Sequence, residues 1–196
     1  MSTNPKQFIT PEEYLEIDRA SEERYEYFDG EMFLMSGGSA RHNSIIFNIG
    51  GSLRAQTKGG RCSGFANSQR VLIDETGLYT YPDVIIVCGQ PVFAHGDTLV
   101  NPTLPVQVLS PSTGNYDKVG KFDQYRKIAS LAEYILVAQD KPHVMRYVRH
   151  EDATWLLSET TNINASGALP SINCHITLKD VYDNVDFTDS QGTLVQ

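Results

Sequence analysis

Apolar and polar residues alternate along the chain with two periods, a helical one near the N-terminus and a strand-like one after it. From Ser39 to about Gln56, apolar residues recur three and four positions apart, which predicts an amphipathic helix. The pattern ends at Lys58-Gly59-Gly60, although Gly50-Gly51 inside it weakens the helical propensity. The apolar positions that define this helix are Ile45, Ile46, Ile49 and Leu53.

Two local signals precede this helix. Thr10-Pro11-Glu12-Glu13 has the pattern of a capping box, with proline in the first turn, and predicts a short helix to about Ala20. Further on, Arg24 to Phe28 and Glu31 to Met35 are short aromatic or apolar runs on either side of Asp29-Gly30. Because Asp-Gly is typical of tight turns, these runs predict a β-hairpin.

After Gly60 the chain consists of short β-branched segments separated by Gly, Pro, Asn or Asp, which predict strands. Between Val84–Cys88 and Leu104–Leu109, the stretch from His95 to Pro105 is expected to be an exposed loop, because it contains Gly96-Asp97 and two prolines. Four segments are expected to form a central sheet: Cys62–Ala66, Arg70–Ile73, Val84–Cys88 and Leu104–Leu109.

The C-terminal part is expected to contain one longer helix, three strands, a last short helix and a polar tail that is loosely attached. In chain order these are Asn115 to Ala129, Tyr134–Val137, Val144–Val148, Trp155–Ser158, Thr177 to Tyr182, and Asp183 to Gln196.

Composition places the chain among ordinary globular proteins. Its 196 residues contain no obvious linker, so residues 1–196 are predicted to form a single domain. No apolar run approaches the roughly 20 residues that cross a bilayer, and the N-terminus lacks a secretory pattern. We therefore expect a cytoplasmic protein that makes no membrane contact.

The net charge of −8, from 16 Lys and Arg against 24 Asp and Glu, gives the whole molecule no positive field. This counts against strong non-specific DNA binding but leaves room for a local basic groove. The three cysteines, Cys62, Cys88 and Cys174, are odd in number, far apart and without the close spacing of a zinc or redox motif. They are expected to be reduced, buried thiols.

Asp83 is the first candidate for chemistry. Tyr81-Pro82-Asp83 stands directly before the apolar run Val84 to Val87, so a rigid strand would present a carboxylate at its mouth. That is suitable geometry for a metal ligand. An isolated Pro-Asp before a strand more often only ends a turn.

Gln107 is the second candidate, because it interrupts the apolar run Leu104 to Leu109. A run of this kind is typical of a strand covered on both faces, where an unpaired amide would cost about 1–3 kcal/mol. Gln107 therefore needs partners. They are either ordinary backbone and side-chain groups or other members of a site.

Asp117, Lys121 and Tyr125 are spaced by four and four, so a helix would place them on one face. Taken alone, they fit a solvated charged face better than a catalytic lysine. The turn Ser110 to Gly114, which precedes them, is best explained as a cap and chain reversal.

Two N-terminal residues complete the candidates. Glu31 is on the second arm of the predicted hairpin, and His42 is in the first turn of the second helix. A lone histidine is more often a structural or surface residue than a ligand, so His42 carries less weight.

Four stretches together resemble the Uma-two family of restriction endonucleases, a branch of the PD-(D/E)XK nuclease superfamily. The similarity spans roughly residues 8 to 182 and rests on the stretches YEYFDGEMFLMSGGSARHNSI, YPDVIIV, PVQVLSPST and YDKVGKFDQYRKIASLAEYILV. The resemblance implies an α/β fold of mixed α+β type, restriction-endonuclease-like, with a central mixed sheet flanked by helices and an N-terminal hairpin. Adjacent strands of that sheet would present one Asp and one Glu to a divalent metal, usually Mg²⁺, near a lysine.

Carried over to this chain, Asp83 matches the family's Pro-Asp carboxylate and Lys121 matches a lysine displaced onto the following helix. Glu31 matches a glutamate of the N-terminal hairpin. The main departure is Gln107, which stands where the family pattern has glutamate before Val-Leu-Ser-Pro-Ser-Thr. An amide offers a carbonyl oxygen but no negative charge, so affinity for a hard cation should fall.

The resemblance therefore implies a metal-dependent DNA endonuclease, impaired by its glutamine. Asp83 and Gln107 would hold Mg²⁺ or Mn²⁺ weakly, and Lys121 would orient water or stabilise developing charge. Glu31 could supply the missing charge, and a homodimer would suit cleavage of both strands. One alternative is a catalytically inactive nuclease-fold module for binding or interaction. A structural or self-associating domain is a third reading, which the net charge supports.

Overall fold

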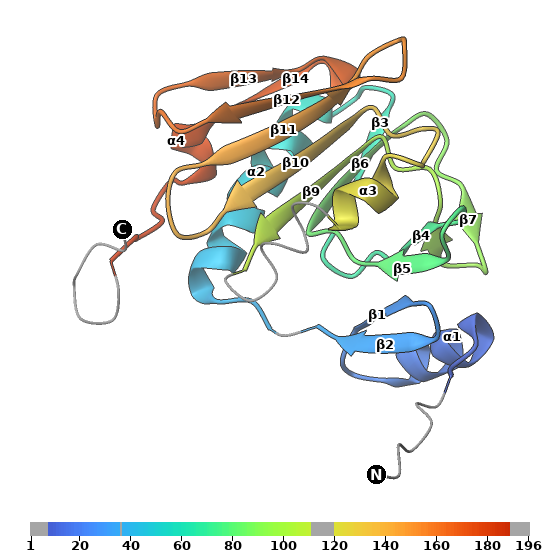
Figure 1. Ribbon diagram of the computed structural model, residues 1–196. Helices are drawn as coiled ribbons and strands as arrows, with labels where there is room; N and C mark the ends of the chain where they lie inside the picture. Colours follow the sequence, from blue (N-terminus) through green and yellow to red (C-terminus); the bar gives the residue numbers. More distant parts are fainter. Residues whose placement is uncertain (1–7, 36, 111–119, 189–196) are drawn as a thin grey trace.

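The computed structural model describes residues 8–35, 37–110 and 120–188, and Figure 1 shows their arrangement. Within these residues, two six-stranded sheets and a two-stranded ribbon are accompanied by short and long helices. The helices are α1 (Pro11–Ala20), α2 (Ala40–Thr57), α3 (Phe122–Tyr125), α4 (Leu178–Val181) and the 3-10 helix η2 (Pro170–Ile172).

The main sheet has the strand order β12-β11-β10-β9-β6-β3. Strands β9 and β10 are parallel, and every other neighbouring pair is antiparallel, so the sheet is mixed as expected. Its strands are β3 (Cys62–Ala66), β6 (Val84–Cys88), β9 (Leu104–Leu109), β10 (Glu133–Ala138), β11 (Val144–Arg149) and β12 (Trp155–Thr160).

The second sheet has the order β2-β1-β5-β4-β8-β7 and lies toward the N-terminal elements (Figure 1). It contains β1 (Tyr25–Phe28), β2 (Glu31–Leu34), β4 (Val71–Ile73), β5 (Leu78–Thr80), β7 (Phe93–Ala94) and β8 (Thr98–Leu99). The separate ribbon pairs β13 (Ser166–Leu169) with β14 (Cys174–Thr177).

The N-terminal signals are confirmed. The Thr10 hydroxyl accepts a hydrogen bond from Glu13 N at 3.2 Å, and the Glu13 carboxylate accepts one from Thr10 N at 2.8 Å. The hairpin turn uses positive φ angles at Asp29 (48°) and Gly30 (79°). The positive φ favours glycine at position 30, and a Cβ there would also displace the exposed Phe8 ring, 2.2 Å away.

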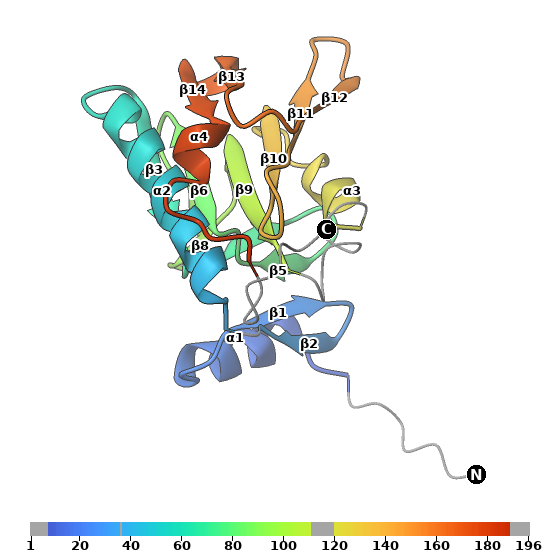
Figure 2. The same cartoon turned by 90° about the vertical axis from the view of Figure 1, so that its left-hand side faces the viewer.

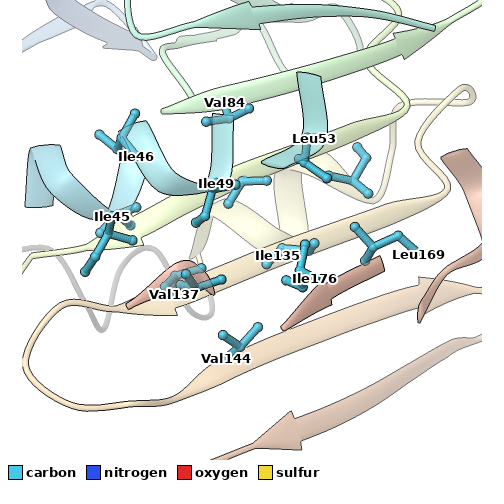
Figure 3. Packing of buried hydrophobic residues seen from close by; sticks show 14 of the residues in the cluster. Ile45, Ile46, Ile49, Leu53, Val84, Ile135, Val137, Val144, Leu169 and Ile176 are labelled. Atoms are coloured by element: carbon cyan, nitrogen blue, oxygen red, sulfur yellow. The ribbon is translucent and has the colours of Figure 1, made fainter. Parts of the chain in front are cut away.

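Helix α2 covers one face of the main sheet, and Figure 2 shows it on the opposite side from α3. Its predicted apolar positions are all buried and pack against Val84, Ile135 and Val137 of the sheet (Figure 3). The ribbon and α4 complete this cluster through residues such as Leu169 and Ile176. A second cluster fills the space between the other face of the main sheet, β4, β5, β8 and α3.

A buried polar network fastens α1 to the second sheet. The Asp18 carboxylate, with no exposed area, lies 2.7 Å from Arg70 Nη2 and accepts a further hydrogen bond from the Tyr81 hydroxyl. Arg70 Nε donates to the Tyr81 oxygen at 2.8 Å. Burial raises the pKa of Tyr81 to about 12, so the phenol stays protonated as a donor. This network holds the segment that leads into β6.

Two expectations about the strands were wrong. Residues Arg70–Ile73 do not join the central sheet, because β4 pairs with β5 and β8 in the second sheet. The stretch His95 to Pro105 is not wholly an exposed loop, because Thr98 and Leu99 are fully buried in β8. The apolar Leu99 packs into the second core cluster, which outweighs the turn signals around it.

The predicted helix from Asn115 to Ala129 is also corrected in part. Residues 111–119 lie outside the described part of the chain, and the α-helix that follows is only α3, Phe122–Tyr125. After Tyr125 the chain turns through a bond from Ile128 N to Tyr125 O at 3.0 Å. The guanidinium of Arg149 donates to the Arg126 and Ala129 carbonyls, so these groups are satisfied without a longer helix.

The expectation of three reduced, buried cysteines was wrong for two of them. Cys62 and Cys88 form a disulfide and are only half-buried, whereas Cys174 is free and buried. The pair is 26 residues apart in sequence but directly opposite in the β3–β6 register. Register places them together, which spacing along the chain does not show.

Residues 183–188, the described part of the tail after Tyr182, are packed more closely than expected, and residues 189–196 lie outside the described residues. Phe187 lies 5.4 Å from the Tyr182 ring, between centroids, and Arg41 donates to the Thr188 carbonyl at 2.9 Å. The apolar residues Val185 and Phe187 explain this, because both pack against the first core cluster. Among the described residues, no helix combines the length and hydropathy that crossing a membrane requires.

Candidate active site

The antiparallel pair β6–β9 brings Asp83 and Gln107 together. Val84 lies opposite Val106, so the residue before β6 and the fourth residue of β9 are neighbours. Asp83 N donates to the Val106 carbonyl at 3.1 Å, and the Asp83 carbonyl accepts from Asn67 N at 2.9 Å. The backbone of Asp83 is thus fixed on both sides.

The Asp83 carboxylate is buried, with 5% of the residue exposed, and is surrounded by N–H donors. Its Oδ2 accepts hydrogen bonds from Gln107 Nε2 at 2.9 Å and from Val108 N at 2.7 Å. Its Oδ1 lies 3.3 Å from His42 Nε2, which comes from the first turn of α2. Two strands and one helix therefore meet at a single carboxylate.

Two polar atoms of this cluster lack a hydrogen-bond partner within the described residues. They are Gln107 Oε1 and His42 Nδ1, both buried. A buried acceptor without a partner costs about 1–3 kcal/mol, so Gln107 Oε1 is an oxygen that would gain from a ligand. The orientation in which the Gln107 amide nitrogen faces Asp83 is the one that avoids contact between two oxygens.

The donor set fits a divalent cation only weakly. Asp83 offers one carboxylate and Gln107 one neutral carbonyl oxygen, and hard cations such as Mg²⁺ prefer several oxygens, most of them charged. Across the described ranges, His, Cys, Asp and Glu nowhere form a group of three that could hold a metal ion. His42 adds an imidazole, which suits Mn²⁺ better than Mg²⁺.

Lys121 stands at the start of α3 and is almost completely buried, with 4% exposed. Its Nζ lies 2.8 Å from Glu26 Oε1, and the same oxygen accepts from the Thr80 hydroxyl at 2.6 Å. Thr80 ends β5, three residues before Asp83. The lysine is therefore tied to the N-terminal hairpin.

Glu31 begins β2 opposite Phe28, in the second sheet rather than in the main sheet with Gln107. Directly opposite residues share a sheet face, and so do residues two apart along one strand. Glu31 and Glu26 are thus on the same face of the hairpin. Asp117 falls within residues 111–119, outside the described part, and Tyr125 is fully buried and stacked on Tyr134 at 4.9 Å.

The sequence did not place His42 beside Asp83, and it gave no reason to name Glu26. His42 had one usable signal, its place in the first turn of a helix that follows a Gly-rich segment, where a side chain can reach the end of the sheet. Glu26 had none, because its pairing with Lys121 spans 95 residues.

Comparison with known proteins finds relatives in sequence and a solved structure of similar fold. Two uncharacterized proteins of Synechocystis sp. are similar to it, one 35% identical over 80% of this chain and 90% of its own length. The other is 33% identical over 91% of this chain and 94% of its own length. In fold the chain resembles the crystal structure of a "putative nuclease belonging to DUF820" from Anabaena variabilis, with a TM-score of 0.73.

That structural likeness covers 89% of this chain and 97% of the other at 17% identity. It shows that the mixed sheets and flanking helices form a restriction-endonuclease-like fold, as expected. The sequence model of the family Uma2, described as "Putative restriction endonuclease", matches residues 11–178. With this match over most of its length, the chain belongs to the Uma2 family.

Proposed function

We propose that this protein is a metal-dependent endonuclease that hydrolyses phosphodiester bonds in DNA and holds its Mg²⁺ or Mn²⁺ weakly. Family membership and the nuclease-like fold support the reaction class. The observation that carries the proposal is the contact between Asp83 and Gln107 on neighbouring strands, with a buried Gln107 oxygen that has no partner within the described chain.

Asp83 and Gln107 would be the metal-holding residues. A bound divalent cation supplies polarisation of the phosphoryl oxygen and a lower pKa for an attacking water. Gln107 would turn its amide to offer Oε1, and Asp83 would give up the hydrogen bond from Nε2. That exchange would weaken binding, because the hydrogen bond from Gln107 Nε2 to Asp83 is lost when Oε1 reaches the cation.

His42 and Lys121 would position the charged groups. The His42 imidazole, 3.3 Å from Asp83 Oδ1, holds the carboxylate in one orientation. Lys121 would stabilise the developing negative charge on the phosphate once its ammonium group was released from Glu26. Glu31, on the same hairpin face as Glu26, is the further carboxylate that the hairpin could bring to the cation.

A second function, a nuclease-fold module that binds without cutting, is favoured by a different aspect of the same contact. Both oxygens of Asp83 already have nitrogen neighbours, His42 on one and Gln107 with Val108 on the other. The carboxylate is therefore stabilised by the protein alone. A carboxylate satisfied in this way does not need a cation for its stability.

Plasmid nicking separates the two functions. The natural protein is incubated with supercoiled DNA and Mg²⁺ or Mn²⁺, beside Asp83→Asn, Gln107→Glu and, as a control for a lost carboxylate elsewhere, Asp152→Asn on an exposed turn. Nicking by the natural protein and the control, but not by Asp83→Asn, supports the enzyme. Nicking by Gln107→Glu alone, or by none of them, would leave only the binding module.

A further inference from the structure

The outward face of α2 carries positive charge in a chain that is acidic as a whole. Between Glu31 and Asp74 the sequence contains five Lys and Arg and no Asp or Glu. Two of the five are used inside the fold, because Arg70 pairs with Asp18 and Asp97, and Arg41 caps the Thr188 carbonyl. The remaining three are Arg54, Lys58 and Arg61.

These three cations are exposed and form no ion pair within the described chain. Arg54 is in the last turn of α2, Lys58 caps its C-terminus, and Arg61 precedes β3. The acidic residues of α4 and of the segment that follows it adjoin the other half of α2, where Asn48 bonds the Val181 and Asp183 carbonyls. Positive charge is therefore concentrated toward the C-terminal end of the helix.

The same face carries two glycines that the fold does not explain. Gly50 and Gly51 lie in the interior of an 18-residue helix, where glycine is less stable than alanine. A Cβ at either position would meet nothing within 4 Å. Helical spacing of four, three and four residues puts Phe47, Gly51, Arg54 and Lys58 on one outward stripe, and Phe47 is 80% exposed.

We propose that this basic stripe, Phe47 to Lys58 with Arg61, binds the phosphate backbone of a nucleic-acid duplex. Three unpaired cations fit a polyanion, and bare helix at Gly50 and Gly51 lets a backbone approach closely. The choice of nucleic acid among polyanions rests on the proposed function. His42 and Lys58 are 16 residues apart on one helix, so their separation along the helix axis, roughly 24 Å, equals the length of about seven base pairs of duplex.

A second copy of the chain fits this face less well. In an antiparallel pairing of two α2 helices around Gly51, Lys58 of each copy would face Ser44 of the other, and Arg41 would approach Arg61. The region between Glu31 and Asp74 contributes no carboxylate to balance these charges. The charge of the stripe therefore favours an anionic partner over a second copy of the chain.

Anisotropy of a labelled 20-base-pair duplex, measured in EDTA at several salt concentrations, tests the stripe without any dependence on cleavage. Contact with about three phosphates predicts that log Kobs falls against log salt with a slope of about −2.7. The double variant Arg54→Glu/Lys58→Glu should bind at least about tenfold more weakly at 0.1 M salt, with a slope near −0.9.

The charge-matched control is Arg126→Glu/Lys127→Glu, at the two residues that directly follow α3, which lies on the opposite side of the main sheet from α2 (Figure 2). Both double variants carry a formal net charge of −8 − 4 = −12, so a difference between them reports the location of the charge. Equal loss in the two would overturn the proposal. So would the absence of salt-dependent binding by the natural protein.

The variant Gly50→Ala/Gly51→Ala gives a readout that a purely structural role would not produce. It should raise the midpoint of thermal unfolding by about 3–8 °C while weakening duplex binding several-fold. A rise in stability with unchanged binding would contradict close approach at the glycines.

If Phe47→Ser instead converts a dimer to a monomer in sedimentation, a second copy covers the stripe and the proposal fails.

The outcomes also separate this proposal from the proposed function. Binding that depends on the stripe, without nicking under any metal, removes only the catalytic proposal. Nicking by the natural protein together with unchanged binding by Arg54→Glu/Lys58→Glu removes only the stripe.

Discussion

Replacing Gln107 by glutamate would put a carboxylate where an N–H group now contacts another carboxylate. Gln107 Nε2 and Asp83 Oδ2 are 2.9 Å apart, and the two residues are only 6% and 5% exposed. The substitution removes a hydrogen bond to a charged group, worth about 1.5–3 kcal/mol, and brings two negative charges together in a site with little water. The pair needs either a proton or a cation.

Protonation sets an upper limit on the loss of stability. A glutamate with an ordinary pKa of about 4.3 costs roughly 3.7 kcal/mol to protonate at pH 7, and about 1 kcal/mol at pH 5. Once protonated, it can donate to Asp83 as the amide does. We therefore expect Gln107→Glu to lower the unfolding midpoint by about 7–15 °C at pH 7 and by only about 2–4 °C at pH 5.

The sign follows from linkage. The new carboxyl would have a folded-state pKa above its unfolded value, so its stabilising proton is present at low pH and lost as pH rises through the folded pKa. A divalent cation should replace the proton. At 100 times its dissociation constant it would restore about 2.7 kcal/mol to the variant, while the natural protein, which already has an N–H donor there, should change far less.

Thermal unfolding at pH 5 and pH 7, with and without Mg²⁺ or Mn²⁺, measures all of these effects. Gln90→Glu, an exposed position with the same change of charge, is the control. An unchanged midpoint at pH 7 in Gln107→Glu would refute the reasoning, because it would mean that the two side chains do not share a buried site. A midpoint that falls equally at both pH values would show that steric strain, rather than charge, is responsible.

Three further predictions concern contacts other than the Asp83–Gln107 pair. Reduction of the Cys62–Cys88 disulfide, which closes a 26-residue separation, should lower the free energy of unfolding by about 3.5 kcal/mol in urea titrations. Reductant should have no effect on the double serine variant. Glu26→Gln weakens the ion pair with the buried Lys121 and should lower the free energy of unfolding by about 1.5–3 kcal/mol. Urea titrations should show a smaller loss when Lys121→Met is combined with it, because no buried charge is then left without a partner. The Arg19 guanidinium is the largest cause that lowers the pKa of Asp97, so this exposed pair stabilises the fold above the unfolded pKa near 4. The contribution, under about 1 kcal/mol, is lost as pH falls through the lowered folded pKa. Arg19→Gln should therefore reduce the acid dependence of urea midpoints between pH 5 and pH 3, and Arg70 should maintain the rest.

Local signals in the sequence predicted local structure well. The capping box at Thr10 and the turn at Asp29-Gly30 depend on atoms a few residues apart, so the residues themselves specify them. The pattern of α2 was also sufficient, because one face of a long helix must be apolar wherever it packs. Asp83 and Gln107 were expected on adjacent strands, and the β6–β9 pairing confirms this.

The failures share a physical cause, which is dependence on partners distant in sequence. The residues of β4 would suit a strand of either sheet. Only its pairing with β5 and β8 decides that it joins the second sheet. Cys62 and Cys88 meet through strand register, and Glu26 meets Lys121 across 95 residues. The catalytic roles of Asp83, Gln107, Lys121 and Glu31 are still predictions.

Helix α2 reaches from the candidate site to the basic stripe as one unbroken element of 18 residues, about 27 Å long. His42 at one end contacts Asp83. A ligand that displaces the imidazole there therefore acts on the same helix that carries Arg54 and Lys58. Thermodynamic reciprocity then applies to the two ends. Whatever factor a cation at Asp83 imposes on the affinity for a polyanion, the polyanion must impose on the affinity for the cation.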